Sequence, residues 1–570
     1  MADGMNLGTA LVDEALGGRM PGGAAGPGKP RLLVRAADPD MTMAGLRDHL
    51  AATGELFDRG GVVVRLVRDG MTGGMVAHAV NAHGIVQAAH RCCRPFSKRA
   101  GKDGAVEEVD ARLSLDLAHM YLAMRGEWGV PVLNGIASAP LLDGAGGVLA
   151  HDGYHAGTGL WCEGVPPGIA ADVPAQPSRT GAAEALLTLR RHLRTFPFAD
   201  ASTVREQGHN VALVDLDAPP GMDESAALVA LLTAVCRPSL NLAPGLLVRA
   251  ASLSGAGSGK GLLVRVVCAI AFGRAPAAVT GGGTPKELDL RIGAELMAGG
   301  PVLFLDNLND TALRSDTLAS AITERPARVR VLGESKMVAL NASALIVLTG
   351  NGLTVREDLA RRFVTIELDA GVEDPEARRF DGDVLAEAHV NRAALLVAAL
   401  TVWRWGRQQD AAGTLAQGLP LGSFGQWCRW VRDPLVALGC ADPARRVAEA
   451  KARDRRREGV AELLTTWHAT HGDTPMTAFT LAEPIVRLLD PQVRGRQYLA
   501  AALSRLVGTR AGGFVLTVQR PAGRWGASTY AVQPTGEAGR AAPDDPYGPY
   551  GSAAPAGDKT AEPAGWQAEL

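Results

Sequence analysis

The chain has 570 residues, of which 47% are hydrophobic and 21% charged, and its formal net charge is −2. This composition is typical of a soluble protein of several domains and excludes a mostly disordered chain. The near-zero net charge means that any nucleic-acid surface must come from local basic patches, and the 5% aromatic content argues against a large base-stacking platform.

Cysteine usage and the amino-terminal segment bear on location. Seven scattered cysteines fit a reduced compartment better than a disulfide framework. The first residues show no basic segment followed by an apolar run, and no run approaches the roughly 18 apolar residues that span a bilayer. We therefore expect a cytoplasmic protein without a membrane partner.

The first half of the chain is predicted to hold a tail, an α+β region and a helical linker. Residues 1–30 are rich in glycine, proline and alanine, as are residues 534–570, and both are predicted to be disordered tails. Residues 31–179 begin with a strand–helix–strand pattern (RLLVRA, MAGLRDHLAATGELF, GGVVVRLVRD) and end in glycine-separated apolar runs typical of β-hairpins. This region has no assigned role. Residues 180–243 carry apolar residues at helical spacing.

Residues 244–370 are predicted to form a P-loop ATPase core, an α/β fold with a parallel sheet, because short apolar runs alternate with helical stretches. The run GLLVRAAS is followed by a glycine-rich loop and then by the helical LLVRVVCAIAF, which is the order that a P-loop requires. The loop amides and the helix N-terminus are expected to bind the phosphates of ATP, and a lysine to reach the β and γ phosphates. The loop consists of Ser254, Gly255, Ala256, Gly257, Ser258, Gly259, Lys260 and Gly261.

Two positions of this loop depart from the pattern G-x-x-x-x-G-K-[ST]. Ser254 stands at the first glycine, and Gly261 replaces the serine or threonine that ligates Mg²⁺. A water molecule in the missing ligand position would keep the Mg²⁺ site, at the expense of affinity. A glycine-rich turn that binds no ligand is the alternative.

The next two predicted strands end in polar residues. PVLFLDN brings Asp306 to the edge of the sheet beside the loop, so Asp306 is predicted to hold Mg²⁺ through its water shell. Asn307 can orient water but cannot accept its proton, and the general base is left open among Asp306, Asp310 and Glu334. ALIVLTGN ends in Asn351, which is predicted to hydrogen-bond the γ-phosphate or the attacking water. A strand-end cap and a turn asparagine are the alternatives for Asp306 and Asn351.

Basic residues lie before and after the predicted strand ALIVLTGN. Two alternating runs around Gly-Glu-Ser predict a β-hairpin that carries Arg328, Arg330 and Lys336. These three are predicted to face a central pore and contact DNA phosphates, with a plain structural hairpin as the alternative. After the strand, a short helix carries Arg361 and Arg362, either of which would stabilise charge on a transferred phosphoryl group. Solvation or local ion pairing is the alternative for both.

Residues 371–456 are predicted to be a helical lid, and residues 457–533 a winged-helix module. The second prediction follows from three helical patterns and a β-hairpin in that order. A winged helix that contacts only protein is the alternative. The residues predicted to approach DNA are Arg494, Arg496, Gln497 and Arg505 of the third helix and Arg520 and Arg524 of the hairpin.

Over roughly residues 55–435, these motifs resemble those of the AAA+/superfamily-3-helicase-like ATPases of phage and integrative-element replication modules. Members of this group also show Asp-Asn and Gly-Lys-Gly where this chain has Asp306-Asn307 and Lys260-Gly261, whereas their Gly-Tyr-Asp is here Gly-Tyr-His, ending in His155. The resembling segments include GVPVLNGIASAPLL, GYHAGTGLW, FPFADAS, TPKELDLRIGAELMAGGPVLFLDN, VLGESKMVAL, LTGNGL, EDLARRFVTIEL and LGSFGQW.

The resemblance implies a hexameric or ring-like ATPase that uses ATP and Mg²⁺ and moves on DNA during the replication of a mobile element. It also implies that Arg361 or Arg362 reaches the nucleotide of a neighbouring subunit. The leading hypothesis is therefore an ATP-hydrolysing DNA motor of the helicase or replication-initiator type. An ATP-binding scaffold without efficient hydrolysis, which would regulate assembly or DNA binding, and a protein-remodelling ATPase are the alternatives.

Overall fold

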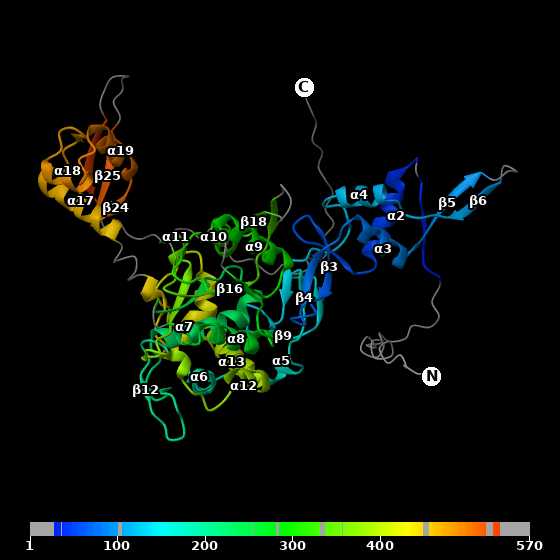
Figure 1. Cartoon of the computed structure of the whole chain (residues 1–570), viewed down its shortest axis with the longest axis horizontal. Helices are drawn as coiled ribbons and strands as arrows, with labels where there is room; N and C mark the ends of the chain where they lie inside the picture. Colours follow the sequence, from blue (N-terminus) through cyan, green and yellow to red (C-terminus); the bar gives the residue numbers. More distant parts are fainter. Residues whose placement is uncertain are drawn as a thin grey trace, which may run out of the picture. The chain divides into compact units, whose positions relative to one another are not determined.

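The computed structural model describes residues 28–35, 37–100, 105–252, 255–280, 284–330, 337–355, 357–447, 455–519 and 528–535. The chain divides into two compact units, Met1–Ala448 and Glu449–Leu570, and each is described by itself (Figure 1). Several residues singled out in the sequence lie outside the described residues, as do nearly all of the two predicted tails. They are Ser254, Glu334, Lys336, Arg520 and Arg524.

The first unit begins with a small α/β layer. Its sheet has the order β1-β5-β6, with β1 parallel to β5 and β5 antiparallel to β6. Three helices pack together beside it around a core that includes Leu46, Ile85 and Tyr121. The elements are β1 (Arg31–Leu33), α2 (Pro39–Ala51), α3 (Ala82–Cys92), β5 (Arg94–Ala100), β6 (Val106–Asp110) and α4 (Leu115–Ala123).

The predicted extent of the first helix is wrong at its carboxyl end. Helix α2 stops at Ala51, and Gly54 follows with φ of +65°. That conformation suits glycine and ends the helix, so the segment that follows is free to form a strand. Leu56 and Phe57 therefore belong to strand β2, which opens an antiparallel meander of β2 (Leu56–Asp58), β3 (Val63–Arg68) and β4 (Met75–Ala79).

Short strands and two long helices lead into the central sheet. The predicted β-hairpins are confirmed, since β8 pairs antiparallel with β9 and β10 with β11. The predicted helices of this stretch are also present, and α7 is buried along almost its whole length. The elements are β7 (Gly135–Ala137), β8 (Leu141–Leu142), β9 (Val148–Leu149), β10 (Gly153–His155), β11 (Leu160–Cys162), α5 (Ile169–Asp172), α6 (Arg179–Leu193), β12 (Thr203–Val204), β13 (Leu213–Val214), α7 (Met222–Cys236) and η1 (Arg237–Ser239).

The central sheet has five parallel strands in the order β15-β16-β20-β14-β22. Strands β14 and β20 are nearly continuous apolar runs and almost wholly buried, as strands covered on both faces must be. The prediction of a parallel α/β sheet is thus confirmed. The strand order reverses at β14, which is where α/β sheets bind ligands at their carboxyl edge. The strands are β14 (Gly245–Ala250), β15 (Ala278–Thr280), β16 (Val302–Asp306), β20 (Leu345–Asn351) and β22 (Phe363–Glu367).

Helices cover this sheet and bury it in the largest core of the protein. Apolar side chains of α7 and α8 pack on β14, β20 and β22 around a small void lined by Ala230, Leu263 and Val267. Helix α13 packs behind them against α6, α7 and α8, and α9 contacts β16 and α10. The remaining helices and strands up to β22 are α8 (Lys260–Phe272), α9 (Pro285–Ala298), β17 (Ala312–Leu313), α10 (Asp316–Thr323), β18 (Ala327–Arg330), β19 (Met337–Leu340), β21 (Thr354–Val355) and α11 (Glu357–Ala360).

The segment after β22 is largely helical, as predicted. Its tryptophans are interior residues, and Trp403 and Trp427 are almost completely buried. Among the described residues, no single helix is long and apolar enough to cross a bilayer. Helices α12 and α13 reach the required length and composition only when taken together, and they are bent by 79° where they meet. The elements are η2 (Pro375–Ala377), α12 (Val384–Val390), α13 (Arg392–Ala411), α14 (Gly425–Trp427), η3 (Cys428–Arg432) and α15 (Asp433–Ala437).

The second unit contains three helices and a four-stranded antiparallel sheet of order β23-β26-β25-β24. Its separate core includes Leu464, Trp467, Leu503 and Val532. The predicted succession of three helices and two long strands is present. The elements are α17 (Arg455–His471), β23 (Met476–Thr477), α18 (Glu483–Leu489), α19 (Arg496–Leu506), β24 (Arg510–Ala511), β25 (Phe514–Gln519) and β26 (Thr529–Pro534).

Candidate functional site

Lys260, Asp306 and Asn351 meet at the carboxyl edge of the central sheet. The glycine-rich loop joins β14 to α8, Asp306 ends β16, and Asn351 ends β20 between them. Ala250 at the end of β14 is the register partner of Asn351. Because all these strands run parallel, their last residues lie along one edge, as the sequence predicts.

Close packing explains why glycine stands at positions 255 and 257 of the loop. A Cβ on Gly255 would lie 2.2 Å from the carbonyl oxygen of Ala251, and one on Gly257 would lie 2.3 Å from Cγ of Glu376. The loop is closed on itself by the hydroxyl of Ser258, which donates to the carbonyl of Gly255 at 2.9 Å.

Helix α8 begins directly after this loop and has no side-chain cap at its N-terminus. The first N–H groups of a helix lack intrahelical partners, so its first turn is electropositive. Loop and helix together form a place where an anion would be stabilised.

Lys260 is the first residue of α8, and its ammonium lies over the loop. Its Nζ donates to the carbonyl of Gly255 at 2.6 Å and to Oγ of Ser258 at 3.2 Å. Burial lowers the pKa of Lys260, and the carboxylate of Asp306 opposes that shift. Neutral oxygens therefore hold this half-buried cation. A phosphate group would take their place as a charged and stronger hydrogen-bond partner.

Asp306 faces the loop from the neighbouring strands and is fixed there by hydrogen bonds. It accepts from the hydroxyl of Thr349 on β20, and from the backbone N–H of Asn307 at 3.0 Å. A Cβ on Gly261 would lie 3.8 Å from Oδ2 of Asp306. The carboxylate therefore stands opposite the position where a serine or threonine hydroxyl is missing.

These residues fit a magnesium ion that is shared with substrate. Mg²⁺ is commonly held by one or two carboxylates together with phosphate oxygens and water, and Asp306 supplies one such carboxylate. In the part of the chain that the structure describes, no group of three or more His, Cys, Asp or Glu side chains is placed to hold a metal. An ion at Asp306 would therefore depend on phosphate oxygens and water for its other ligands.

The turn after Asp306 has an unusual backbone. Asn307 and Asp310 have φ of +60° and +48°. Non-glycine residues rarely adopt this conformation, and the residues that do so are often at functional sites. Asn307 is exposed. Asp310 accepts a hydrogen bond from the hydroxyl of Ser252, just before the loop, and its N–H donates to the carbonyl of Asn351 at 2.8 Å.

Asn351 lies against the loop with an unsatisfied acceptor. Its backbone N–H donates to Oδ1 of Asn309 at 2.8 Å, whereas its own Oδ1 is buried and lacks a hydrogen-bond partner among the described residues. That oxygen lies 2.7 Å from the Cβ position of Gly255. A buried polar atom without a partner usually marks a place for water or a ligand.

Arg378 is a site residue that the sequence analysis missed. It follows η2, which packs on Gly257, and its Nη2 donates to the carbonyl of Gly257 at 3.1 Å. Burial lowers the pKa of Arg378. It is a second cation beside the loop, and only its position after the last core strand, in the run EARRF, hinted at it.

The two arginines after α11 have different surroundings. Arg362 donates through Nη1 to the carbonyl of Ala319 at 2.7 Å and to the hydroxyl of Thr323 at 2.9 Å, both in α10. Arg361 is exposed. Arg362 therefore stabilises the end of α10 within its own chain, whereas Arg361 is presented at the surface.

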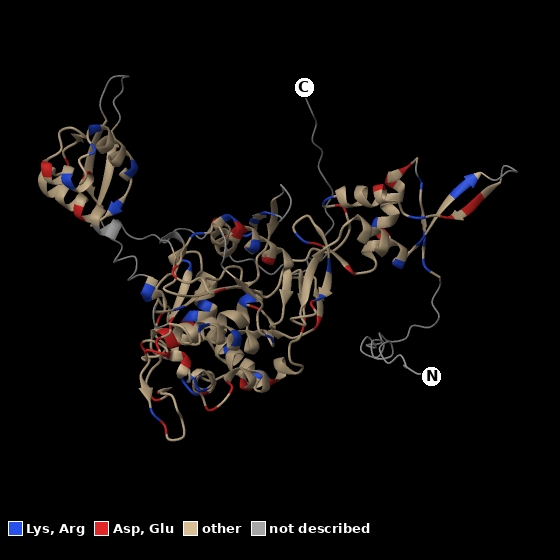
Figure 2. Ribbon diagram, in the orientation of Figure 1, with Lys and Arg blue, Asp and Glu red and all other residues tan. Residues whose placement is uncertain are grey.

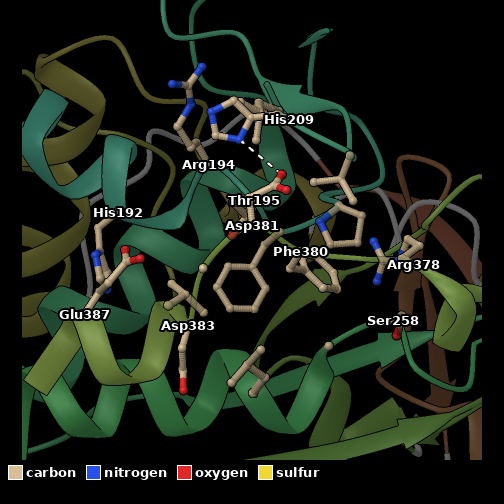
Figure 3. Close-up of a pocket in the computed structure, with 18 of the residues that line it drawn as sticks. His192, Arg194, Thr195, His209, Ser258, Arg378, Phe380, Asp381, Asp383 and Glu387 are labelled. Atoms are coloured by element: carbon tan, nitrogen blue, oxygen red, sulfur yellow. Dashed lines mark ion pairs between the residues drawn. The ribbon is translucent and has the colours of Figure 1, made fainter. Parts of the chain in front are cut away.

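A cavity of about 540 Å³ opens beside the loop. Figure 3 shows Ser258 of the loop at one end and His192 with Glu387 at the other, with the ring of Phe380 between them. Phe380 is 48% exposed. The volume and the mixed lining suit a small organic ligand.

Asp381 and His209 line this cavity and come from segments that are far apart in the sequence. Asp381 accepts from the backbone N–H of Asn210 at 2.9 Å, and its carboxylate lies 3.8 Å from Nδ1 of His209. Burial lowers the pKa of His192, against the opposing charge of Glu387. Nε2 of His192 is buried without a partner among the described residues, so a polar atom is available at the wall of the cavity.

The described residues predicted to meet DNA are exposed and belong to both units. Strands β18 and β19 pair as the predicted hairpin, and Arg328 and Arg330 project from its exposed face, opposite the buried Ala327 and Val329. In the second unit, Arg496 and Arg505 are exposed on α19.

A ring contact holds part of the α19 surface in place. The guanidinium of Arg494 lies 4.5 Å from the ring centre of Tyr498, and that of Arg505 lies 5.8 Å from the same ring. These residues form a basic surface with an aromatic residue in it, as nucleic-acid-binding surfaces often do.

Comparison with known proteins adds little to this geometry. No family model matches the chain, and no curated protein matches it. Among solved structures, the A form apo structure of the NrS-1 C terminal region is 13% identical with a TM-score of 0.32, over 85% of this chain and 98% of that one. The structure titled SCCmec type IV Cch, active helicase, is 10% identical with a TM-score of 0.28, over 84% and 97%. Similarity this low does not by itself establish a common fold.

Proposed function

We propose that this chain is a cytoplasmic, ATP-hydrolysing DNA motor of the AAA+/superfamily-3-helicase-like kind, with a P-loop core, and that it works as a ring of identical subunits. The observation that carries the proposal is the meeting of Lys260, Asp306 and Asn351 at one sheet edge, around a loop in which Gly255 and Gly257 leave no room for a side chain. The setting in a mobile element is what the resemblance to that group implies.

ATP binding assigns a role to each side of the loop. The loop amides and the first turn of α8 bind the β and γ phosphates, and Lys260 and Arg378 exchange loop carbonyls for phosphate oxygens. The cavity beyond Ser258 takes the base and ribose, and Phe380 offers an aromatic surface to the base.

Hydrolysis needs a positioned water and a proton acceptor. Asn351, with its unsatisfied Oδ1 beside the loop, orients the attacking water. The amide of Asn307 hydrogen-bonds water but takes no proton, so Asp306, Asp310 or Glu334 accepts it. Asp306 would hold a magnesium ion, which would supply positive charge beside the phosphate oxygens.

Assembly and DNA binding use the exposed arginines. Arg361 reaches the nucleotide of the neighbouring subunit, because its side chain is exposed, whereas Arg362 is half-buried and donates to α10. Arg328, Arg330 and Lys336 contact DNA phosphates from the β18–β19 hairpin. The second unit acts as a winged helix that presents Arg496 and Arg505 to DNA.

Steady-state ATPase activity with and without single-stranded DNA tests the proposal. We expect DNA to stimulate turnover. Lys260→Ala should abolish this turnover, whereas the control variant Lys286→Ala, at an exposed lysine of α9, should retain it. Nucleotide binding without turnover would favour the scaffold, and turnover indifferent to DNA would favour a protein-remodelling ATPase. Either result would overturn the motor.

An Asn307→Glu variant tests the assignment of the proton acceptor. If Asp306, Asp310 or Glu334 already accepts the proton, the added carboxylate gains little turnover. A gain of about a hundredfold, within the range of general-base catalysis, would mean that the natural site lacks a working base.

A further inference from the structure

The ribbon formed by β5 and β6 contributes nothing to the nucleotide site. Its register pairs Lys98 with Glu108 and Arg99 with Glu107. Strand β1 pairs with β5 only as far as Phe96. Beyond that point, the outer edge of β5 has no strand beside it among the described residues, and neither has the outer edge of β6.

Exposure shows that the ribbon lies outside the core of its own chain. All five residues of β6 are exposed, and Val106 is 68% exposed. Figure 1 shows the ribbon extending beyond α2, α3 and α4. A two-stranded ribbon is marginally stable by itself in water, and its unpaired edges are sites for another strand.

Charge is divided between the two strands. Strand β5 carries Arg94, Lys98 and Arg99, and β6 carries two glutamates and an aspartate, so one strand is basic and the other acidic (Figure 2). The three positive and three negative charges cancel, which removes the net attraction that a polyanion such as DNA would require. The ribbon instead matches a surface with the same two stripes of charge.

One facing pair forms no ion pair among the described residues. Lys98 lies 3.9 Å from Glu108, and Arg94 lies 2.8 Å from Asp110. Arg99 and Glu107, although directly opposite in register, form no ion pair with any described residue. Both are exposed and of opposite sign, so each is available to an oppositely charged residue of another molecule.

We propose that the β5–β6 ribbon is an assembly arm that joins one copy of this chain to the next. Strand β6 of one copy adds to the outer edge of β5 of its neighbour, at Ser97–Ala100, and repeats between chains the alternation of basic and acidic strands found within one chain. Arg99 of one copy then meets Glu107 of the next. Such a contact is head-to-tail, which generates rings when the rotation closes.

The inference rests on the proposed function only in that a ring motor needs neighbouring subunits. Its test measures self-association and requires no nucleotide. A chain that lacks ATPase activity and a chain that does not associate through the ribbon are therefore separate results.

Charge reversal at Arg99 and Glu107 tests the arm in the full chain. Arg99→Glu makes both positions acidic, and Glu107→Arg makes both basic, so each variant alone brings like charges together at every contact between copies. We expect each to self-associate about tenfold more weakly than the natural chain, measured by sedimentation velocity. In an equimolar mixture every contact between unlike copies is attractive again, and association returns to the natural level.

The rescue separates contact between chains from folding, because the like-charged pair within each chain persists in the mixture. The exposed pair Arg91 and Glu55, 3.3 Å apart, provides the control, since Arg91→Glu and Glu55→Arg should leave association unchanged. A natural chain that stays monomeric would overturn the proposal. So would an equimolar mixture that associates no more strongly than either variant alone. Loss of DNA binding by Arg99→Glu without loss of association would make the ribbon a nucleic-acid contact instead.

Discussion

Replacing Gly257 by alanine tests how closely the loop packs under the segment that carries Arg378. A Cβ at position 257 would lie 2.3 Å from Cγ and 2.8 Å from the backbone N of Glu376, and φ of Gly257 is +69°. A left-handed conformation costs an L residue roughly 1 to 2 kcal/mol. Overpacking adds about 1 to 3 kcal/mol. We therefore expect the variant to lose about 2 to 5 kcal/mol.

Gly259→Ala is the matched control in the same loop. Gly259 also has a positive φ, of +97°, but the atom nearest to its Cβ position is Cδ1 of Phe196 at 3.6 Å, an ordinary contact. Only the conformational cost of roughly 1 to 2 kcal/mol applies. The two variants should thus differ by about 1 to 3 kcal/mol, and the contact with Glu376 causes the difference.

Urea unfolding of the full chain, followed by tryptophan fluorescence, measures the comparison. Trp403, Trp427 and Trp430 belong to the same core as α8, so their fluorescence reports on the unit that contains the loop. We expect the midpoint to fall further for Gly257→Ala, and ATP affinity to fall with it, because displacement of η2 carries Arg378 away from the loop. Equal midpoints, or a larger loss for Gly259→Ala, would refute the packing argument.

Three further predictions concern the edges of the site. Arg362→Ala should lose about 1 to 3 kcal/mol of stability in thermal unfolding, because it removes two hydrogen bonds to α10. Arg361→Ala, at an exposed side chain, should lose about a thousandfold in ATPase rate, which Arg362→Ala should not; the opposite pattern would reverse the assignment. Gly261→Ser should lower the magnesium concentration needed for half-maximal ATPase activity, because its hydroxyl would join Asp306 as a ligand, and an unchanged requirement would place the ion elsewhere. Burial lowers the pKa of His192, so the folded state binds this proton less readily than the unfolded state, and stability should fall as the pH drops below about 6.5. His192→Gln should therefore show a smaller fall in melting temperature at acid pH. A fall identical to that of the natural chain would exclude His192 as its source.

The central site was predictable because it follows from sheet geometry. Asp306 and Asn351 each end an apolar run, and parallel strands bring such ends to the same edge as the loop before Lys260. The apolar runs themselves show that the strands are buried, so periodicity and turn residues suffice for this part. The departure at Gly261 was equally visible, although the position of Asp306 opposite it needed the structure.

The walls of the site were not predictable in the same way. Arg378 and Phe380 reach the loop because the segment after β22 folds back over it, and no local pattern encodes such a long-range return. The choice between Arg361 and Arg362 depended likewise on α10, some forty residues earlier in the chain. The end of α2 has a local cause, because Gly54 adopts a left-handed conformation that ends the helix, although the residues around it are compatible with a longer one.

An equilibrium titration with ATP, in the presence and absence of Mg²⁺, tests the central claim most directly. The natural chain should take up ATP saturably and more tightly with Mg²⁺. Asp306→Asn should retain ATP binding but lose the effect of Mg²⁺, while Asp316→Asn, at an exposed position in α10, should retain both. An absence of saturable uptake, or a magnesium effect that survives Asp306→Asn, would contradict the account.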